Sequence, residues 1–160
     1  MIHNGLGACP VLCHAVHLLP PVTYRVCCCC CRRCDCSLEF GQRLLTVAGL
    51  GTDSANAVQL LPADALPEPP KDRHNAYGNS YYYLPAKRRL FVRRQRFDNS
   101  GSFMMAVIHA IAHIKADPET FSDANPMFVQ EYYRTLEVCG QEMFSQTERL
   151  TKLQQSAAAE

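Results

Sequence analysis

A long apolar stretch in the second half of the chain carries the clearest pattern. Every residue from Phe103 to Ile114 is apolar except His109 and His113, so most sides of this segment need cover from the rest of the protein. The polar run Asp98-Asn-Ser-Gly-Ser102 offers several N-cap residues, and Asp117-Pro118 stops the segment. The sequence therefore predicts a core helix that begins near Phe103 and ends before the proline.

A second helix is predicted downstream, because Asn125-Pro126 places a capping residue before a proline at the first helical position. Gly140 is a point where this helix can end or loosen, residues 141–155 can continue it, and residues 154–160 are expected to fray. Apolar residues recur along it in steps of three and four, which is typical of a helix with one buried face: Phe128, Tyr132, Leu136, Cys139 and Met143.

The residues before the apolar stretch predict a β-hairpin. Tyr81-Tyr-Tyr-Leu84 and Arg89-Leu-Phe-Val-Arg-Arg94 are rich in residues that favour strands, and Pro85-Ala-Lys-Arg88 between them suits a turn. Together with the two helices, this hairpin indicates a small α+β domain over residues 72–153, in which the β-hairpin packs on two or three helices.

The first 71 residues show weaker patterns. Residues 1–40 are cysteine-rich, low in complexity and without a sustained helical or strand period, so we expect this segment to be poorly ordered. Residues 41–71 contain the apolar run Leu44-Leu-Thr-Val-Ala48 and then a proline-rich stretch from Leu61 to Pro70. This pattern predicts one short strand or helix followed by an extended linker.

Cysteine usage indicates a reducing compartment. Nine of the ten cysteines lie in the first 36 residues, five of them consecutive from Cys27 to Cys31. Consecutive cysteines are poorly placed to close disulfide loops, so we expect an intracellular, cytoplasmic protein. No apolar run reaches the ~20 residues that a membrane span needs. Two interpretations of the cysteine string stay open: S-palmitoylation that attaches the protein to a membrane surface, and a low-complexity run without a role.

The overall charge identifies no class of partner, since 16 basic against 15 acidic residues leave a formal net charge of +1. The hairpin region, however, is locally basic and rich in tyrosine. This surface can contact a protein partner, can bind nucleic acid through phosphate contacts and base stacking, or can protect a sheet edge from aggregation. We expect a protein partner rather than nucleic acid, because the chain is near neutral. The six cations are Lys87, Arg88, Arg89, Arg93, Arg94 and Arg96.

The two histidines of the apolar helix are the candidate ligands for a metal. Residues four apart share one helix face, so His109 and His113 can bind one ion. Glu131, early on the second helix, is the expected third ligand of a zinc site. The favoured alternative is a metal-free pair of neutral core histidines that hydrogen-bond to a tyrosine or a carboxylate. Other acidic residues near enough in sequence to serve as the third ligand are Asp117, Asp123 and Glu137.

The order of features over residues 81–137 resembles the core of zincin-type metallopeptidases: a hairpin, a capped turn, an apolar helix with H-x-x-x-H, and a helix with an acidic residue. The resemblance implies zinc held by His109, His113 and Glu131. It does not extend to catalysis, because the glutamate that activates water in H-E-x-x-H enzymes is replaced by Ala110.

These observations lead to an expected function without catalytic residues. We expect a non-catalytic interaction or scaffold module, a zincin-like pseudopeptidase, that contacts a protein partner through its tyrosine- and arginine-rich hairpin. No cofactor is expected other than the zinc ion that the histidine pair can hold. The alternatives are a zinc-dependent hydrolase with a non-standard general base and a membrane-tethered adaptor that is palmitoylated on its cysteine string.

Overall fold

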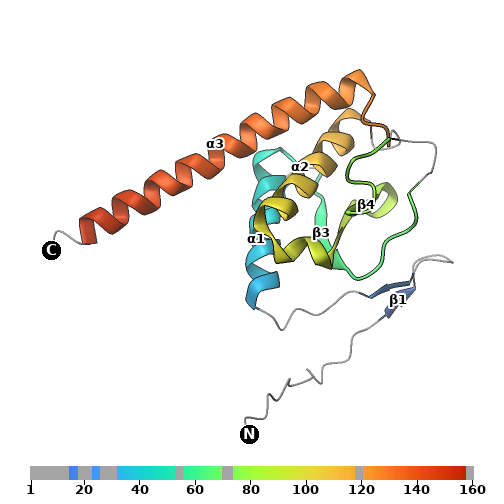
Figure 1. The fold of residues 1–160 in the computed structure, drawn as a ribbon, viewed down its shortest axis with the longest axis horizontal. Coiled ribbons are helices and arrows are strands. Elements are labelled where there is room, and N and C mark those ends of the chain that lie inside the picture. The colour runs from blue at the N-terminus through green and yellow to red at the C-terminus, as the bar shows by residue number, and fades with distance from the viewer. Residues whose placement is uncertain are drawn as a thin grey trace, which may run out of the picture.

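The computed structural model of the protein describes residues 15–17, 23–25, 32–52, 56–69, 74–117 and 121–157. The fold class is α+β, as predicted, and helices cover a small sheet (Figure 1). In chain order the elements are β1 (Ala15–His17), β2 (Thr23–Arg25), α1 (Arg32–Val47), β3 (Gln59–Ala63), β4 (Tyr81–Leu84), β5 (Arg89–Arg93), α2 (Ser100–Ala116) and α3 (Pro126–Ala157).

The predicted hairpin is confirmed, and a further strand joins it. β4 and β5 pair antiparallel across a short 3-10 turn at Pro85–Lys87, and β3 lies parallel to β5 on the other side, so the strand order is β3-β5-β4. β3 lies at the edge of the sheet, where Pro62 is tolerated because one side of an edge strand needs no backbone donor. A parallel partner far along the chain leaves no local sequence signal, which explains why β3 was expected to be part of a linker.

The central strand β5 is buried on both faces. Leu90 and Val92 join the main core, whereas Phe91 packs with Ala63 on the opposite side of the sheet. Two cations of the basic cluster have local partners. Arg94 forms an ion pair with Asp64 at 2.8 Å, and the Arg96 guanidinium donates to the Ser102 hydroxyl at 2.8 Å.

Helix α2 is the predicted core helix. It begins at Ser100, three residues earlier than expected, because the Asn99 side chain accepts a hydrogen bond from the Ser102 backbone N–H at 2.8 Å and caps the helix there. It ends at Ala116. All residues from Ala106 to His113 are buried, in agreement with the apolar pattern.

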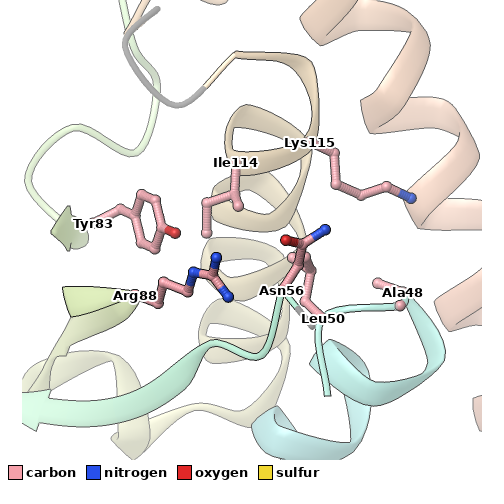
Figure 2. A pocket seen from close by; sticks show the side chains of 8 residues that line it. Ala48, Leu50, Asn56, Tyr83, Arg88, Ile114 and Lys115 are labelled. Atoms are coloured by element: carbon pink, nitrogen blue, oxygen red, sulfur yellow. The ribbon is translucent and has the colours of Figure 1, made fainter. Parts of the chain in front are cut away.

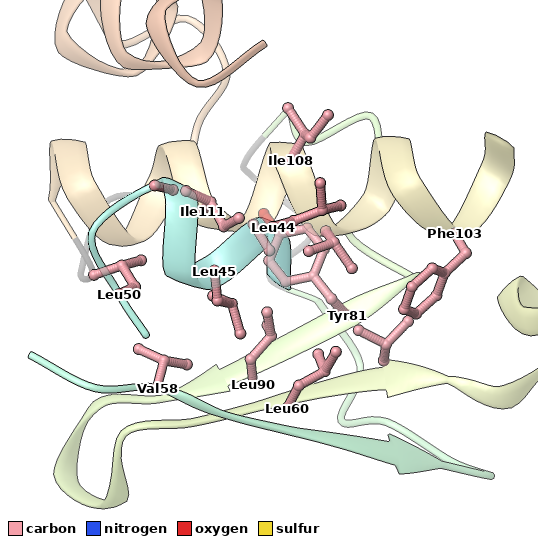
Figure 3. Close-up of a cluster of buried hydrophobic side chains, with 14 of the residues drawn as sticks. Leu44, Leu45, Leu50, Val58, Leu60, Tyr81, Leu90, Phe103, Ile108 and Ile111 are labelled. Carbon is pink, nitrogen blue, oxygen red and sulfur yellow. The ribbon is translucent and has the colours of Figure 1, made fainter. Parts of the chain in front are cut away.

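The core lies between α2, α1 and the sheet, and α1 and β3 supply a substantial part of it (Figure 3). α1 and β3, both before residue 72, therefore pack with the expected domain, although we expected a short element and a linker there. The short strand or helix predicted at Leu44–Ala48 is the end of α1, whereas the start of this helix at Arg32 was not predicted. Gly41 in its middle stands at a buried position, where a Cβ would meet the Leu60 and Phe103 side chains. The labelled contributors to this core include Leu44, Leu45, Leu60, Leu90, Phe103, Ile108 and Ile111.

Helix α3 is longer than its apolar stripe suggested. The Asn125 side chain accepts from the Met127 N–H at 2.9 Å, and the helix then runs through Gly140 without a break to Ala157. Phe128 and Cys139 are buried against the body, whereas the distal part of the helix projects away from it (Figure 1). The predicted second helix is thus confirmed, but Gly140 does not end it.

The cysteine-rich segment is only partly within the described residues. α1 begins at Arg32, inside residues 1–40, which we expected to lack regular structure, and β1 and β2 form a short antiparallel pair. The consecutive cysteines Cys27–Cys31 lie outside the described residues. Among the helices that the structure describes, none combines the length and apolarity needed to cross a membrane.

Candidate metal centre

The two histidines of α2 point to a single carboxylate oxygen. The Nε2 atoms of His109 and His113 lie 3.1 and 2.9 Å from Oδ1 of Asp123. The two rings are 5.0 Å apart, centre to centre, as expected for residues four apart on one helix. Both histidines are almost fully buried, with exposed fractions of 3% and 5%. Of the three potential metal ligands, two are therefore buried, and Asp123 is partly exposed, at 25%.

Asp123 comes from the connection between α2 and α3, and the backbone before β4 holds it in place. Its Oδ2 accepts a hydrogen bond from the Ala76 N–H at 2.7 Å, and its own N–H donates to the His74 carbonyl at 2.8 Å. One oxygen is thus held by backbone while the other faces the histidines. This position is determined by two segments that are 47 residues apart in the sequence.

A tyrosine and an asparagine orient the His109 ring through its other nitrogen, Nδ1. The Tyr81 hydroxyl lies 3.3 Å from His109 Nδ1, and Asn75 Nδ2 donates to the Tyr81 oxygen at 3.1 Å and to the Phe121 carbonyl at 3.3 Å. The Asp123 carboxylate can only accept, so neutral His109 carries its proton on Nε2 and donates it to Oδ1. Nδ1 is then the acceptor for the Tyr81 hydroxyl proton.

Aromatic rings close the site. Phe128 of α3 stacks on His113 with ring centres 4.0 Å apart, and it also contacts His109 at 4.8 Å. Tyr77 and Tyr132 lie 4.8 and 5.8 Å from the His109 ring. These rings keep water from the two imidazoles, which strengthens their hydrogen bonds and penalises an unpaired charge on them, whereas Asp123 stays partly exposed.

The burial changes the protonation of these groups. Desolvation lowers the pKa of His109 to about 4, and the nearby Asp123 charge opposes this effect only in part. Burial alone would raise the pKa of Asp123, but hydrogen bonds from Ala76, His113 and His109 outweigh it, so the pKa is lowered. Burial also raises the pKa of Tyr81. At neutral pH the site thus combines a neutral His109 and a neutral Tyr81 with a carboxylate.

This donor set suits zinc. One ligand atom from each of His109, His113 and Asp123 lies within 4.8 Å of the others, and imidazole nitrogen and carboxylate oxygen are ordinary zinc ligands. Ligand atoms ~2.0–2.2 Å from a tetrahedral ion are separated by roughly 3.4 Å, so a small outward movement of the two rings would admit it. Metal at the Nε2 atom of His109 would require its proton to move to Nδ1, where the Tyr81 oxygen can accept it.

Of the expected ligands, the structure brings together His109 and His113 but not Glu131. The Glu131 carboxylate lies 3.4 Å from the Lys115 amine and 3.6 Å from the Arg134 guanidinium, and it does not belong to the cluster. Asp123, a secondary candidate in the sequence, takes the place of Glu131. Asp117 and Glu137 also stay outside the cluster. The only sequence signal for Asp123 as a ligand was its proximity to His109 and His113 along the chain.

The position that carries the general base in zinc peptidases has no functional group here. Ala110 is fully buried and, together with Ile111, belongs to the main core. Within the described part of the chain, Asp123 is the only acidic side chain grouped with the histidine pair, and both of its oxygens are already engaged. The cluster can thus bind an ion or form hydrogen bonds, but it supplies no separate group to activate water.

Comparisons with models of known protein families, with curated proteins and with solved structures gave no match to this chain.

Proposed function

We propose that this protein is a non-catalytic interaction module in which His109, His113 and Asp123 bind one zinc ion. The convergence of both Nε2 atoms on Oδ1 of Asp123 is the observation that carries the proposal. The ion would connect α2 to the segment before α3 and, through Ala76, to the segment before β4. Its role would be structural, since bound metal stabilises the fold that holds its ligands.

The resemblance to zincin-type metallopeptidases supports the same proposal. The hairpin and the capped helix with H-x-x-x-H follow one another as in the resemblance, but the acidic residue of the cluster is Asp123 in the loop before α3, not Glu131 on α3. Ala110 argues against the alternative of a zinc-dependent hydrolase, because alanine neither accepts a proton nor orients water. A pseudopeptidase that keeps the metal and lacks the base is the interpretation that accounts for both observations.

The interaction surface that we propose is the exposed end of the β4–β5 hairpin. Lys87 and Arg88 at the turn are exposed. Arg94 contacts Asp64 and Arg96 contacts Ser102. A protein with acidic residues at its contact surface suits these cations better than nucleic acid does, since the chain as a whole is near neutral. The run of cysteines favours an intracellular setting.

A competition titration tests the metal. The purified full chain is titrated with zinc against a chromophoric chelator, beside three variants. Asp123→Ala and His109→Ala each remove a proposed ligand, and the control His74→Ala removes a histidine outside the cluster. We expect Asp123→Ala and His109→Ala each to lose one equivalent of tightly bound zinc and His74→Ala to lose none. Equal zinc content in all four proteins would overturn the metal assignment.

Two further measurements test the absence of catalysis and the contact surface. The zinc-loaded chain should not hydrolyse a mixed peptide library, and zinc-dependent hydrolysis that disappears in His109→Ala would refute the non-catalytic proposal. For the surface, affinity purification from cells is compared between the unmodified chain and Lys87→Glu. We expect this charge reversal to remove a defined set of partners, and an unchanged set would contradict the proposed hairpin contact.

A further inference from the structure

Helix α3 carries a second apolar stripe beside the face that packs on the body. On the packed face, Phe128, Thr135 and Cys139 are buried. The Lys115 side chain extends from α2 toward this helix, and its amine lies 3.4 Å from the Glu131 carboxylate (Figure 2). The stripe follows the neighbouring side of α3 in steps of three and four residues, so its members share one side of the helix. They are Val129, Tyr133, Leu136, Gly140 and Phe144.

Most of this stripe is open to solvent. Tyr133 and Phe144 are 68% and 73% exposed, and Val129 is exposed as well. Leu136, in contrast, packs partly against the core. Single exposed apolar residues are ordinary on a protein surface. A row of them along one side of a projecting helix is instead typical of a contact surface for another protein.

Gly140, inside this stripe, is not explained by contacts within the described chain. A Cβ at this position would meet no atom from another part of that chain within 4 Å, whereas a Cβ at Gly41 would collide with the Leu60 and Phe103 side chains. Glycine also disfavours a helix more than any residue except proline. Because two packed helices are separated by the side chains at their contact, a second helix can approach α3 most closely at Gly140.

The apolar residues around Gly140 are arranged for contact with a copy of themselves. A two-fold dimer brings the same surface of both copies together, so this surface must complement itself. Leu136 precedes Gly140 by four residues and Phe144 follows it by four. When two α3 helices cross antiparallel at Gly140, Leu136 of one copy therefore meets Phe144 of the other, once on each side of the crossing.

The charged residues next to the stripe fit the same arrangement. Arg134 precedes Gly140 by six residues and Glu148 follows it by eight, and both are exposed. A two-fold axis between antiparallel helices places the same edge of both helices side by side, so Arg134 of one copy comes near Glu148 of the other. The Arg134 guanidinium lies 3.6 Å from Glu131 of its own chain. Its five N–H groups can bind a second carboxylate as well.

We propose that a second copy of this chain binds along the stripe, as an antiparallel dimer in which the two α3 helices cross at Gly140. The distal part of each helix, which projects from its own body, then lies beside the other copy (Figure 1). The contact covers a few turns of one helix, less than the ~1,200 Å² of stable complexes, so we expect a dissociation constant of roughly 0.1–1 mM. In a dilute unfolding measurement the chain is therefore a monomer.

Sedimentation equilibrium of the full chain tests this dimer, in reducing buffer with a chelator so that neither disulfides nor zinc contribute. The mean mass should rise with concentration from the monomer toward twice that value and no further. Phe144→Gln should weaken association by at least about tenfold, because it removes an apolar contact at the crossing. Met127→Gln is the matched control. Met127 is also exposed on α3 but lies two residues from Val129, hence on another side, and its replacement should change nothing.

Gly140→Gln separates a role in the contact from a role in folding. Glutamine favours a helix more than glycine does, so the urea midpoint of the dilute monomer should not fall. The same change fills the space at the crossing and holds the two helices apart, so association should weaken by at least about tenfold. Unchanged association in Gly140→Gln would overturn the proposed crossing point.

Charge reversal tests the antiparallel arrangement. Arg134→Glu and Glu148→Arg should each weaken self-association, because like charges then meet across the crossing. An equimolar mixture of the two variants should associate as the unmodified chain does, since opposite charges face each other again. Failure of the mixture to associate would contradict the arrangement. Growth beyond a dimer, or association that Phe144→Gln leaves unchanged, would show unspecific aggregation, and a monomer at every concentration would assign the stripe to a different protein. Each of these results would overturn the proposal.

Discussion

Helix α2 has two faces that differ in the interactions they make. The face toward α1 and the sheet is apolar, and Phe103, Val107 and Ile111 are fully buried there. The face toward α3 and the preceding loop carries His109 and His113, which are nearly as deeply buried but bonded to the same carboxylate. Residues on both faces are therefore similarly buried, but one face makes apolar contacts and the other makes hydrogen bonds to a carboxylate.

The two faces differ in whether their interactions depend on direction. Apolar contacts depend on volume and area, so the sheet-facing side contributes most of the stability and tolerates changes of similar size. The histidine side depends on single atoms at hydrogen-bond distance, so small changes there leave polar atoms unpaired. The apolar face thus makes the helix stable, and the polar face gives it the chemistry that can recognise an ion.

The largest expected effect is on the apolar face. Phe103→Ala removes a fully buried ring and should lower the free energy of unfolding by about 3–5 kcal/mol, measured by urea denaturation. Phe144→Ala on α3, where the ring is 73% exposed, is the matched control and should change it by less than about 0.5 kcal/mol. Similar losses in both variants would contradict the placement of the core.

The next effect concerns the carboxylate of the polar face. Asp123→Ala leaves His109, His113 and the Ala76 N–H without their acceptor, so we expect a loss of about 1–3 kcal/mol in metal-free buffer. Glu131→Ala is the comparison. Its ion pair with Lys115 is partly buried but long, at 3.4 Å, so we expect a smaller loss, of about 1 kcal/mol. A larger loss for Glu131→Ala would indicate that the sequence-based ligand set describes the site better.

A smaller effect concerns Tyr81, whose hydroxyl lies next to Nδ1 of His109. Tyr81→Phe keeps the ring in the core but removes the oxygen that accepts the Nδ1 proton when zinc occupies Nε2. Loss of such an outer partner lowers metal affinity by roughly 10–100-fold. The chelator competition measures it, with the exposed Tyr133→Phe as control. Unchanged affinity in Tyr81→Phe would exclude Tyr81 as a positioning residue.

The remaining effect, the pH dependence of the polar face, is absent at neutral pH and appears only on acidification. The pKa of His109 falls to about 4 because of burial, so between pH 6.5 and about 4 the unfolded chain binds a proton that the folded chain does not. Stability contributed by neutral His109 is complete above pH 6.5 and should decline on acidification by at most ~1.4 kcal/mol per pH unit.

Denaturation with a chelator present measures this slope, and His109→Phe should reduce it. The Asp123 contribution appears in a lower window, since its pKa lies below the ordinary value of 3.8. An identical slope in His109→Phe would show that other groups cause the acid sensitivity.

The two faces also differ in how well the sequence predicts them. The apolar run of α2, its cap near Asn99 and the β4–β5 hairpin are encoded in neighbouring residues, and local patterns found them. Asn75 and Asp123 reach the histidines only through the tertiary fold, so spacing identified the pair but favoured Glu131 as its partner. β3 and the first part of α1 were not predicted for related reasons. β3 pairs with a parallel strand distant in the sequence, and α1 contains Gly41 at a buried position.

The most direct test of the proposed zinc site is X-ray absorption at the zinc edge of the zinc-loaded full chain. We predict two imidazole nitrogens at ~2.0–2.1 Å and a carboxylate oxygen at ~2.0–2.2 Å, with the imidazole scattering lost in the His109→Ala, His113→Ala double variant. Sulfur ligands at ~2.3 Å, which survive in that double variant, would place the metal on the cysteine-rich segment and contradict the assignment to His109, His113 and Asp123.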